Sequence, residues 1–147
     1  MESLSFLAVF ALIIHFNKSL VSNYNRLGYL ILLSGILFGL HWVFNSLHNI
    51  GGLPLYFSIP ATLLLAIYVA SFYAFALFIA KKYKFIPLEV AAIVTLFEWT
   101  KSFLFTGFPW IEIGTLSLNT PLVNYAPIFG TYAVTFVATL LVVYMVN

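Results

Sequence analysis

Glu98 and Lys101 are the residues of this 147-residue sequence whose types and spacing most clearly suggest chemistry. They interrupt an apolar run, and a separation of three places both on one face of a helix, within reach of each other. Charged side chains within apolar segments are rare and usually mark a functional site or a buried pair. Two interpretations follow: a mutually neutralising pair that fixes helix packing, or a contact to a lipid headgroup or substrate. Trp99 beside them is typical of the aromatic belt at a membrane surface.

A second polar group consists of His41, Asn45 and His48, which follow one another at helical spacing. Two histidines can ligate a metal ion, but these lie two turns apart and no third strong ligand accompanies them. We therefore predict no metal site here and expect hydrogen bonds between helices or a location at the membrane interface. The sequence predicts no cofactor.

Glu112 is the acidic residue of the segment 106–114, Thr-Gly-Phe-Pro-Trp-Ile-Glu-Ile-Gly. This segment is too apolar for an ordinary hydrated loop, since Phe108, Trp110 and the two isoleucines favour the headgroup boundary or a partner surface. It is either a re-entrant turn at the interface or a docking site for a lipid or a soluble domain.

The familiar nucleophile and phosphate-binding patterns do not occur in this sequence. It has no cysteine, which excludes a thiol nucleophile, a disulfide and a zinc–thiolate site within these residues. It also contains neither Gly-x-Ser-x-Gly nor His-Glu-x-x-His, and no glycine-rich phosphate loop follows a strand. A net charge of +2 gives no reason to expect nucleic acid as a partner.

The elements that position these residues must be membrane helices. Hydrophobic residues make up 63% of the sequence, charged residues 7%, and the mean hydropathy is +1.08. A soluble domain carries about 25% charged residues, so six basic and four acidic side chains cannot cover a surface that faces water. Because the alternating polarity of membrane strands is missing, we predict an all-α integral membrane helical bundle forming a single transmembrane domain over 1–147.

Apolar runs of about 20 residues can cross the hydrocarbon core. We predict five transmembrane helices, of which the first and last are short, at 3–16, 27–47, 55–80, 86–105 and 131–146. The connections 17–26 and 81–85 carry lysine or arginine, whereas 49–54 and the Pro/Gly-rich loop 106–130 carry neither. By the positive-inside rule, the first two connections face the cytoplasm and the other two face outward.

Two stretches of sequence resemble a known family. The first contains Trp42, Ser46 and Gly51-Gly52-x-Pro54. The second contains Phe97-Glu98-Trp99, then Thr106-Gly107-Phe108-Pro109-Trp110, then Ala126-Pro127-Ile128-x-Gly130. Their order and spacing resemble the membrane-spanning N-terminal part of bacterial apolipoprotein N-acyltransferase over roughly residues 27–140.

The resemblance implies an activity and a location. Members of the family transfer an acyl chain from a phospholipid to the N-terminal cysteine of lipoproteins, at the outer face of the bacterial cytoplasmic (inner) membrane. Their membrane helices support a nitrilase-like domain whose Glu–Lys–Cys triad forms a thioester. The partners implied are therefore the phospholipid bilayer, a separate nitrilase-like domain and lipoprotein substrates.

The sequence departs from the family pattern in ways that bear on activity. The nitrilase-like domain and its cysteine are missing, which indicates a truncated or split protein that is inactive alone. Lys101 stands where the family usually has arginine, Glu112 where it often has glutamine, and Asn45 at a usually apolar position. The alternative is a non-enzymatic membrane scaffold or lipid-binding module. Under either interpretation we expect lipid or partner contacts at Trp42, His48, Glu98, Trp99, Lys101, Phe108, Pro109 and Trp110.

Overall fold

The computed structural model describes residues 24–117 and 120–146, and this part contains helices, turns and irregular connections but no strand. The prediction of an all-helical chain is therefore confirmed for these residues. The predicted span 3–16 and most of the connection 17–26 lie outside the described residues.

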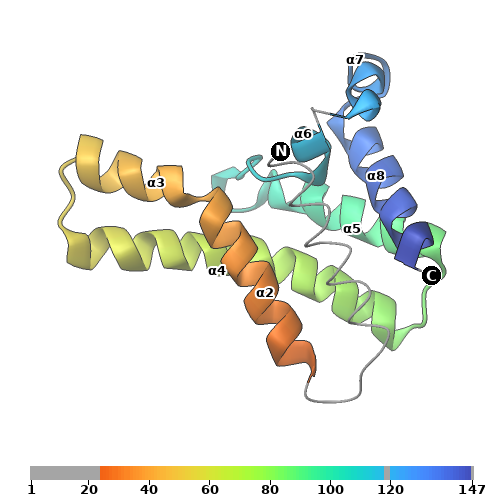
Figure 1. Ribbon diagram of the computed structural model, residues 1–147, viewed down its shortest axis with the longest axis horizontal. Helices are drawn as coiled ribbons and strands as arrows, with labels where there is room; N and C mark the ends of the chain where they lie inside the picture. The colour runs from red at the N-terminus through yellow and green to blue at the C-terminus, as the bar shows by residue number, and fades with distance from the viewer. Residues whose placement is uncertain (1–23, 118–119, 147) are drawn as a thin grey trace.

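The helices follow one another in a simple order (Figure 1). They are α2 (Tyr24–Gly39), α3 (His41–Asn45), the π-helix η1 (Ser46–Ile50), α4 (Leu55–Lys82), α5 (Pro87–Lys101), the 3₁₀ helix η2 (Leu104–Thr106), α6 (Ile113–Leu116), the 3₁₀ helix η4 (Pro121–Tyr125), α7 (Ala126–Phe129) and α8 (Thr131–Val146).

The helix α4 is the axis of the fold. Its 28 residues extend about 42 Å at 1.5 Å per residue, which is more than the hydrocarbon thickness. Its first part packs against α3 and η1, and it also contacts α2 and α5 (Figure 1). It is the one described helix that is long and apolar enough to cross a membrane unaided.

The apolar run predicted at 27–47 is not one straight helix. The segments 28–39 and 41–50 meet at an angle of 49°. The bend lies beside Gly39, where the side chain of Ile111 packs so closely that an added Cβ would lie 3.2 Å from its Cδ1 atom. With this bent pair counted as one span, the described residues hold two candidate spans, so the count of five remains a prediction.

The run predicted at 86–105 begins as expected and ends early. Pro87 occupies the first turn of α5, and Glu89 accepts a hydrogen bond of 2.9 Å from the Ile86 N–H at Oε2. The helix stops at Lys101, and the chain then turns through Phe105 and Gly107, whose φ angles are 52° and 81°. A Cβ atom on Gly107 would lie 2.1 Å from the Ser102 carbonyl oxygen, so only glycine fits this turn.

Small residues on α4 allow its neighbours to approach closely. Ala66, Ala70 and Ala76 are completely buried between the helices, as expected for packing in lipid. In contrast, large apolar side chains such as Leu64, Phe75 and Phe78 of α4 are more than half exposed. An outer surface of this kind is suited to hydrocarbon and would be costly in water.

Candidate functional site

The carboxyl group of Glu98 on α5 is the centre of a buried hydrogen-bond network that also joins α4, the start of α6 and α8. Its side chain is 1% exposed. Oε1 accepts hydrogen bonds from Tyr73 Oη on α4 at 2.5 Å and from the Ile113 N–H at 2.8 Å. Oε2 accepts one from Thr135 Oγ1 on α8 at 2.7 Å. A buried carboxyl group is tolerable when its oxygens are satisfied in this way.

Lys101 lies one turn further along α5 and is completely buried. Its Nζ donates to the carbonyl oxygens of Trp110 and Ile111 at 3.1 and 3.3 Å, and it lies 5.7 Å from the centre of the Tyr73 ring. Lys101 therefore holds the loop 107–112 through its backbone, and the Glu98 carboxyl group holds the residue that follows this loop. Both side chains serve the same loop from adjacent turns of one helix.

Ile111 has a backbone conformation that β-branched residues rarely adopt, with φ at 59°. Its carbonyl oxygen accepts a hydrogen bond from Lys101 Nζ and lies 2.9 Å from Tyr73 Oη, whose single hydrogen is shared with Glu98. Such a conformation persists only when its surroundings fix it. The two buried donors supply that constraint, and they define the path of the loop.

The short helix α6 sits unusually close to α8. The Gly114 N–H donates to Thr135 Oγ1 at 2.9 Å. A Cβ atom on Gly114 would lie 2.3 Å from the carbonyl oxygen of Thr131, so the absence of a side chain permits this approach. Thr135 links Gly114 to Glu98, and α5, α6 and α8 are thereby held by one hydroxyl group.

Glu112 is also buried, at 3% exposure, and its Oε1 has no hydrogen-bond partner among the described residues. The pKa of this carboxyl group is raised to about 7, chiefly by burial and also by the nearby Glu98, while Lys101 and the Tyr132 hydroxyl act in the opposite direction. Glu112 is therefore a group whose charge can change near neutral pH, located beside the strained Ile111.

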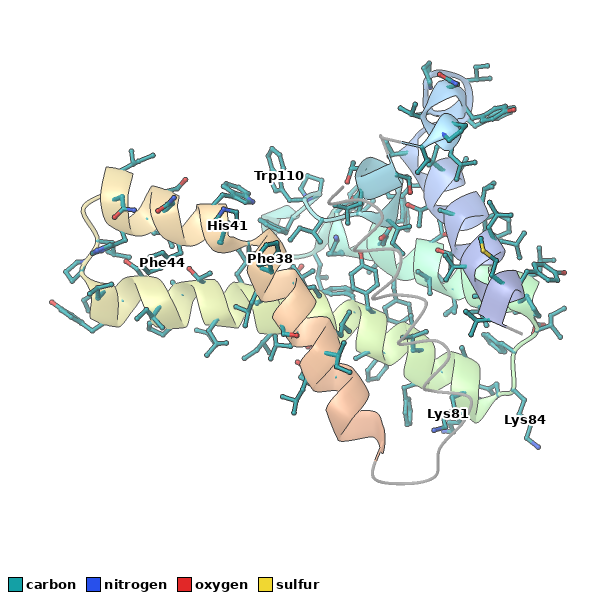
Figure 2. All side chains as sticks on the ribbon, viewed as in Figure 1. Phe38, His41, Phe44, Lys81, Lys84 and Trp110 are labelled. Atoms are coloured by element: carbon teal, nitrogen blue, oxygen red, sulfur yellow. The ribbon has the colours of Figure 1, made fainter. Side chains whose placement is uncertain are left out.

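Aromatic side chains occupy the outer side of the same loop. The rings of Trp42 on α3 and Trp110 lie edge to face with centroids 5.5 Å apart, and Figure 2 shows Trp110 next to the start of α3. Trp110 is 58% exposed, Pro109 is exposed, and Phe108 is partly buried against the core. The backbone of the loop thus bonds to buried polar side chains, while its Trp110 and Pro109 side chains form an apolar surface that is accessible from outside.

The structure brings most of the predicted residues together, although not all of them. Glu98 and Lys101 meet the loop that carries Phe108, Pro109 and Trp110, and Trp42 joins from α3. Trp99 is half exposed and pairs instead with Phe103, at 4.9 Å. Glu98 and Lys101 bond to α4, α6, α8 and the loop rather than to each other, and a contact of this pair with a lipid headgroup or substrate stays a prediction.

The histidines make local contacts rather than contacts between distant helices. The Nδ1 atom of His41 lies 2.9 Å from the Phe38 carbonyl oxygen, and that of His48 lies 2.8 Å from the Leu53 carbonyl oxygen. Asn45 accepts a hydrogen bond from Asn49 in the next turn. His48 therefore stabilises the turn between η1 and α4. It is not one of the residues that bond to Glu98.

Sequence reasoning missed Tyr73 and Thr135, which complete the network. Each is a hydroxyl-bearing residue within an apolar run, so each gives a weak signal by itself. Pairing them with Glu98 requires the contacts between α4, α5 and α8 that only the folded structure supplies.

Apolar helices with exposed large side chains and a satisfied polar network inside are typical of integral membrane helical bundles. A comparison with known families identifies the family of this chain. The model of the apolipoprotein N-acyltransferase N-terminal domain matches residues 1–144, and the chain belongs to this family.

Individual relatives agree with the family match. The chain is 36% identical over 110 residues to apolipoprotein N-acyltransferase of Haemophilus ducreyi, covering 74% of this chain and 22% of that protein. It is 33% identical over 100 residues to that of Pasteurella multocida, covering 67% of this chain and 19% of the relative. The matched region thus spans about a fifth of the length of these relatives.

Proposed function

We propose that these residues form the membrane platform of an apolipoprotein N-acyltransferase, in the bacterial inner membrane. The complete activity is acyl transfer from a phospholipid to the N-terminal cysteine of lipoproteins. The observation that carries the proposal is the family match over residues 1–144, together with a loop whose backbone at Trp110, Ile111 and Ile113 bonds to buried side chains.

This chain positions the lipid or the catalytic domain rather than carrying the acyl group itself. It has no cysteine and hence no thiolate to carry that group. A nitrilase-like domain, on the same or a separate polypeptide, supplies that group. Loops 49–54 and 106–130 face outward in this arrangement, and 17–26 and 81–85 face the cytoplasm. Exposed Trp110 and Pro109, with Trp42 behind them, then present an apolar surface to the lipid or to the catalytic domain.

Glu98 and Lys101 act behind that surface. Their hydrogen bonds fix the backbone of residues 110–113, so the side chain of Trp110 is held in place without local secondary structure. His48 and Trp99 are proposed as contacts with the surrounding lipid or a partner at the ends of their helices.

A chimera tests the proposal. Residues 1–144 replace the equivalent part of a full-length relative in a bacterium depleted of its own apolipoprotein N-acyltransferase, and mass spectrometry of a lipoprotein reports N-acylation. We expect the chimera to restore N-acylation and the isolated 147 residues to give no turnover. Trp110→Ala in the chimera should lower the rate at unchanged membrane levels, whereas exposed Met145→Ala on α8 should not.

A non-enzymatic lipid-binding module is the second candidate, and an apolar groove favours it. The groove has a volume of about 860 Å³ and lies between α5, η4, α7 and α8, lined by residues including Leu122, Tyr125, Phe129 and Phe136. A chimera that reaches the membrane in normal amounts without restoring N-acylation would favour this candidate. Turnover by the isolated chain would refute both accounts.

A further inference from the structure

Three lysines lie together at the turn between α4 and α5. Lys81, Lys82 and Lys84 are all exposed, and Figure 2 shows Lys81 and Lys84 extending away from the helices at the end of α4. They are half of the six basic residues in the sequence. The turn is therefore the most concentrated positive charge on the part of the chain that the structure describes.

The backbone at this turn has the geometry of a Schellman C-cap. The Phe85 N–H donates to the Ala80 carbonyl oxygen at 2.9 Å, and the Lys84 N–H donates to the Lys81 carbonyl oxygen at 3.3 Å. The residue at the left-handed position of this motif is normally glycine. Here it is Lys84, with φ at 54°, so a lysine occupies a position where its Cβ is unfavourable.

The surroundings of the lysines combine apolar and aromatic side chains. Lys82 Nζ lies 5.5 Å from the centre of the Tyr83 ring, and Tyr83 stacks on Phe85. Tyr83 and Ile86 are 63% and 58% exposed. Glu89, the acidic residue closest in sequence, uses its carboxyl group at the start of α5. A cationic turn flanked by exposed rings and aliphatic groups matches the boundary between headgroups and hydrocarbon.

We propose that this basic turn, residues 81–84, binds the headgroups of anionic phospholipids. The proposal rests on the membrane location proposed above. Lysines within a Debye length of an anionic membrane surface each contribute roughly 5-fold in affinity. A role in headgroup binding explains why lysine, rather than glycine, is present at position 84. It also gives the turn a function beyond setting the orientation of α4.

Thermal unfolding of the purified chain in a neutral detergent tests this proposal. Phosphatidylglycerol or phosphatidylcholine is added to the micelles, and circular dichroism reports the midpoint. We expect phosphatidylglycerol to raise the midpoint by several degrees more than phosphatidylcholine does, and high salt to reduce the difference. The triple variant K81Q/K82Q/K84Q should lose at least half of the difference, and K81R/K82R/K84R should keep it.

The single variant Lys84→Gly separates binding from folding. Without lipid its midpoint should rise, since glycine relieves the left-handed conformation, while the specific effect of phosphatidylglycerol should decrease. An unchanged phosphatidylglycerol effect in both Lys84→Gly and the triple glutamine variant would overturn the proposal. Because N-acylation by the chimera is a separate measurement, failure of lipid binding here can be distinguished from failure of the proposed function.

Discussion

Tyr73 on α4 donates a hydrogen bond of 2.5 Å to the Glu98 carboxyl group on α5, and both side chains are 1% exposed. The same hydroxyl group lies 2.9 Å from the Ile111 carbonyl oxygen. One phenol thus connects two long helices to the loop that they support. Because both groups are buried and the bond is short, this contact is a suitable first test of the network.

Removing the hydroxyl group should destabilise the bundle. Tyr73→Phe keeps the ring and removes the one hydrogen that Glu98 Oε1 and the Ile111 carbonyl oxygen share. We expect the free energy of unfolding to fall by about 1–3 kcal/mol, measured by denaturation in mixed micelles. Tyr144→Phe on α8 is the control, because Tyr144 is 63% exposed. Equal stability of the two variants would mean that the hydrogen bond contributes nothing.

Substitutions of Glu98 should lower the free energy of unfolding in proportion to the number of buried hydrogen-bond donors that they leave without an acceptor. Glu98→Gln retains an oxygen for Tyr73 and the Ile113 N–H but presents an amide donor to Thr135. Glu98→Ala removes the acceptor of three buried donors, so it should cost more than the about 1–2 kcal/mol expected for glutamine. Limited proteolysis between residues 106 and 114 should report loosening of the loop in the alanine variant first. A loop equally protected in both variants would refute the positioning role.

Substitution by alanine should lower the free energy of unfolding by different amounts at Gly114 and at Gly39, although both glycines lie close to neighbouring atoms. At Gly114 the new Cβ would lie 2.3 Å from a backbone oxygen of α8, which cannot move without shifting the helix. At Gly39 it would meet the end of the Ile111 side chain at 3.2 Å, which can rotate. We therefore expect Gly114→Ala to cost about 1–3 kcal/mol and Gly39→Ala to cost less, by the same unfolding measurement. The reverse order would show that α6 is not fixed against α8.

Stability should depend on pH through Glu112. Its carboxyl group titrates at about 7 in the fold, above the ordinary value of 4.5. Between these two values the folded state binds more protons than the unfolded state, so stability falls as pH rises toward 7 and then levels off. Glu112→Gln cannot ionise and should lack this component.

The measurement for Glu112 is a comparison of the two proteins at different pH. Below pH 4.5 the wild type and Glu112→Gln should be similar, and at pH 8 the glutamine variant should be the more stable. Histidines titrate in both proteins, so their contribution cancels in the difference. A difference that is constant from pH 5 to pH 8 would contradict the burial of this carboxyl group.

The sequence by itself predicted an all-helical chain and pointed to most residues of the candidate site. Apolar runs that have few charges predict helices in lipid, because only a helix satisfies its own backbone there, and α4 and α8 occupy the ranges 55–82 and 131–146. Glu98 and Lys101 stood out because charges within apolar runs are costly. The motif Thr-Gly-Phe-Pro-Trp marked the loop, and its spacing led to the family that the comparison confirmed.

Tertiary structure alone decided what the charged residues do. Spacing places Glu98 and Lys101 on one face of a helix, but it does not show that Lys101 binds the carbonyl oxygens at 110 and 111. The bend between α2 and α3, the early end of α5 and the recruitment of Tyr73 and Thr135 also depend on contacts between distant segments. The local sequence pattern indicates whether a segment faces lipid, water or the protein interior. The hydrogen-bond partners of a side chain depend instead on which helices pack together in the fold.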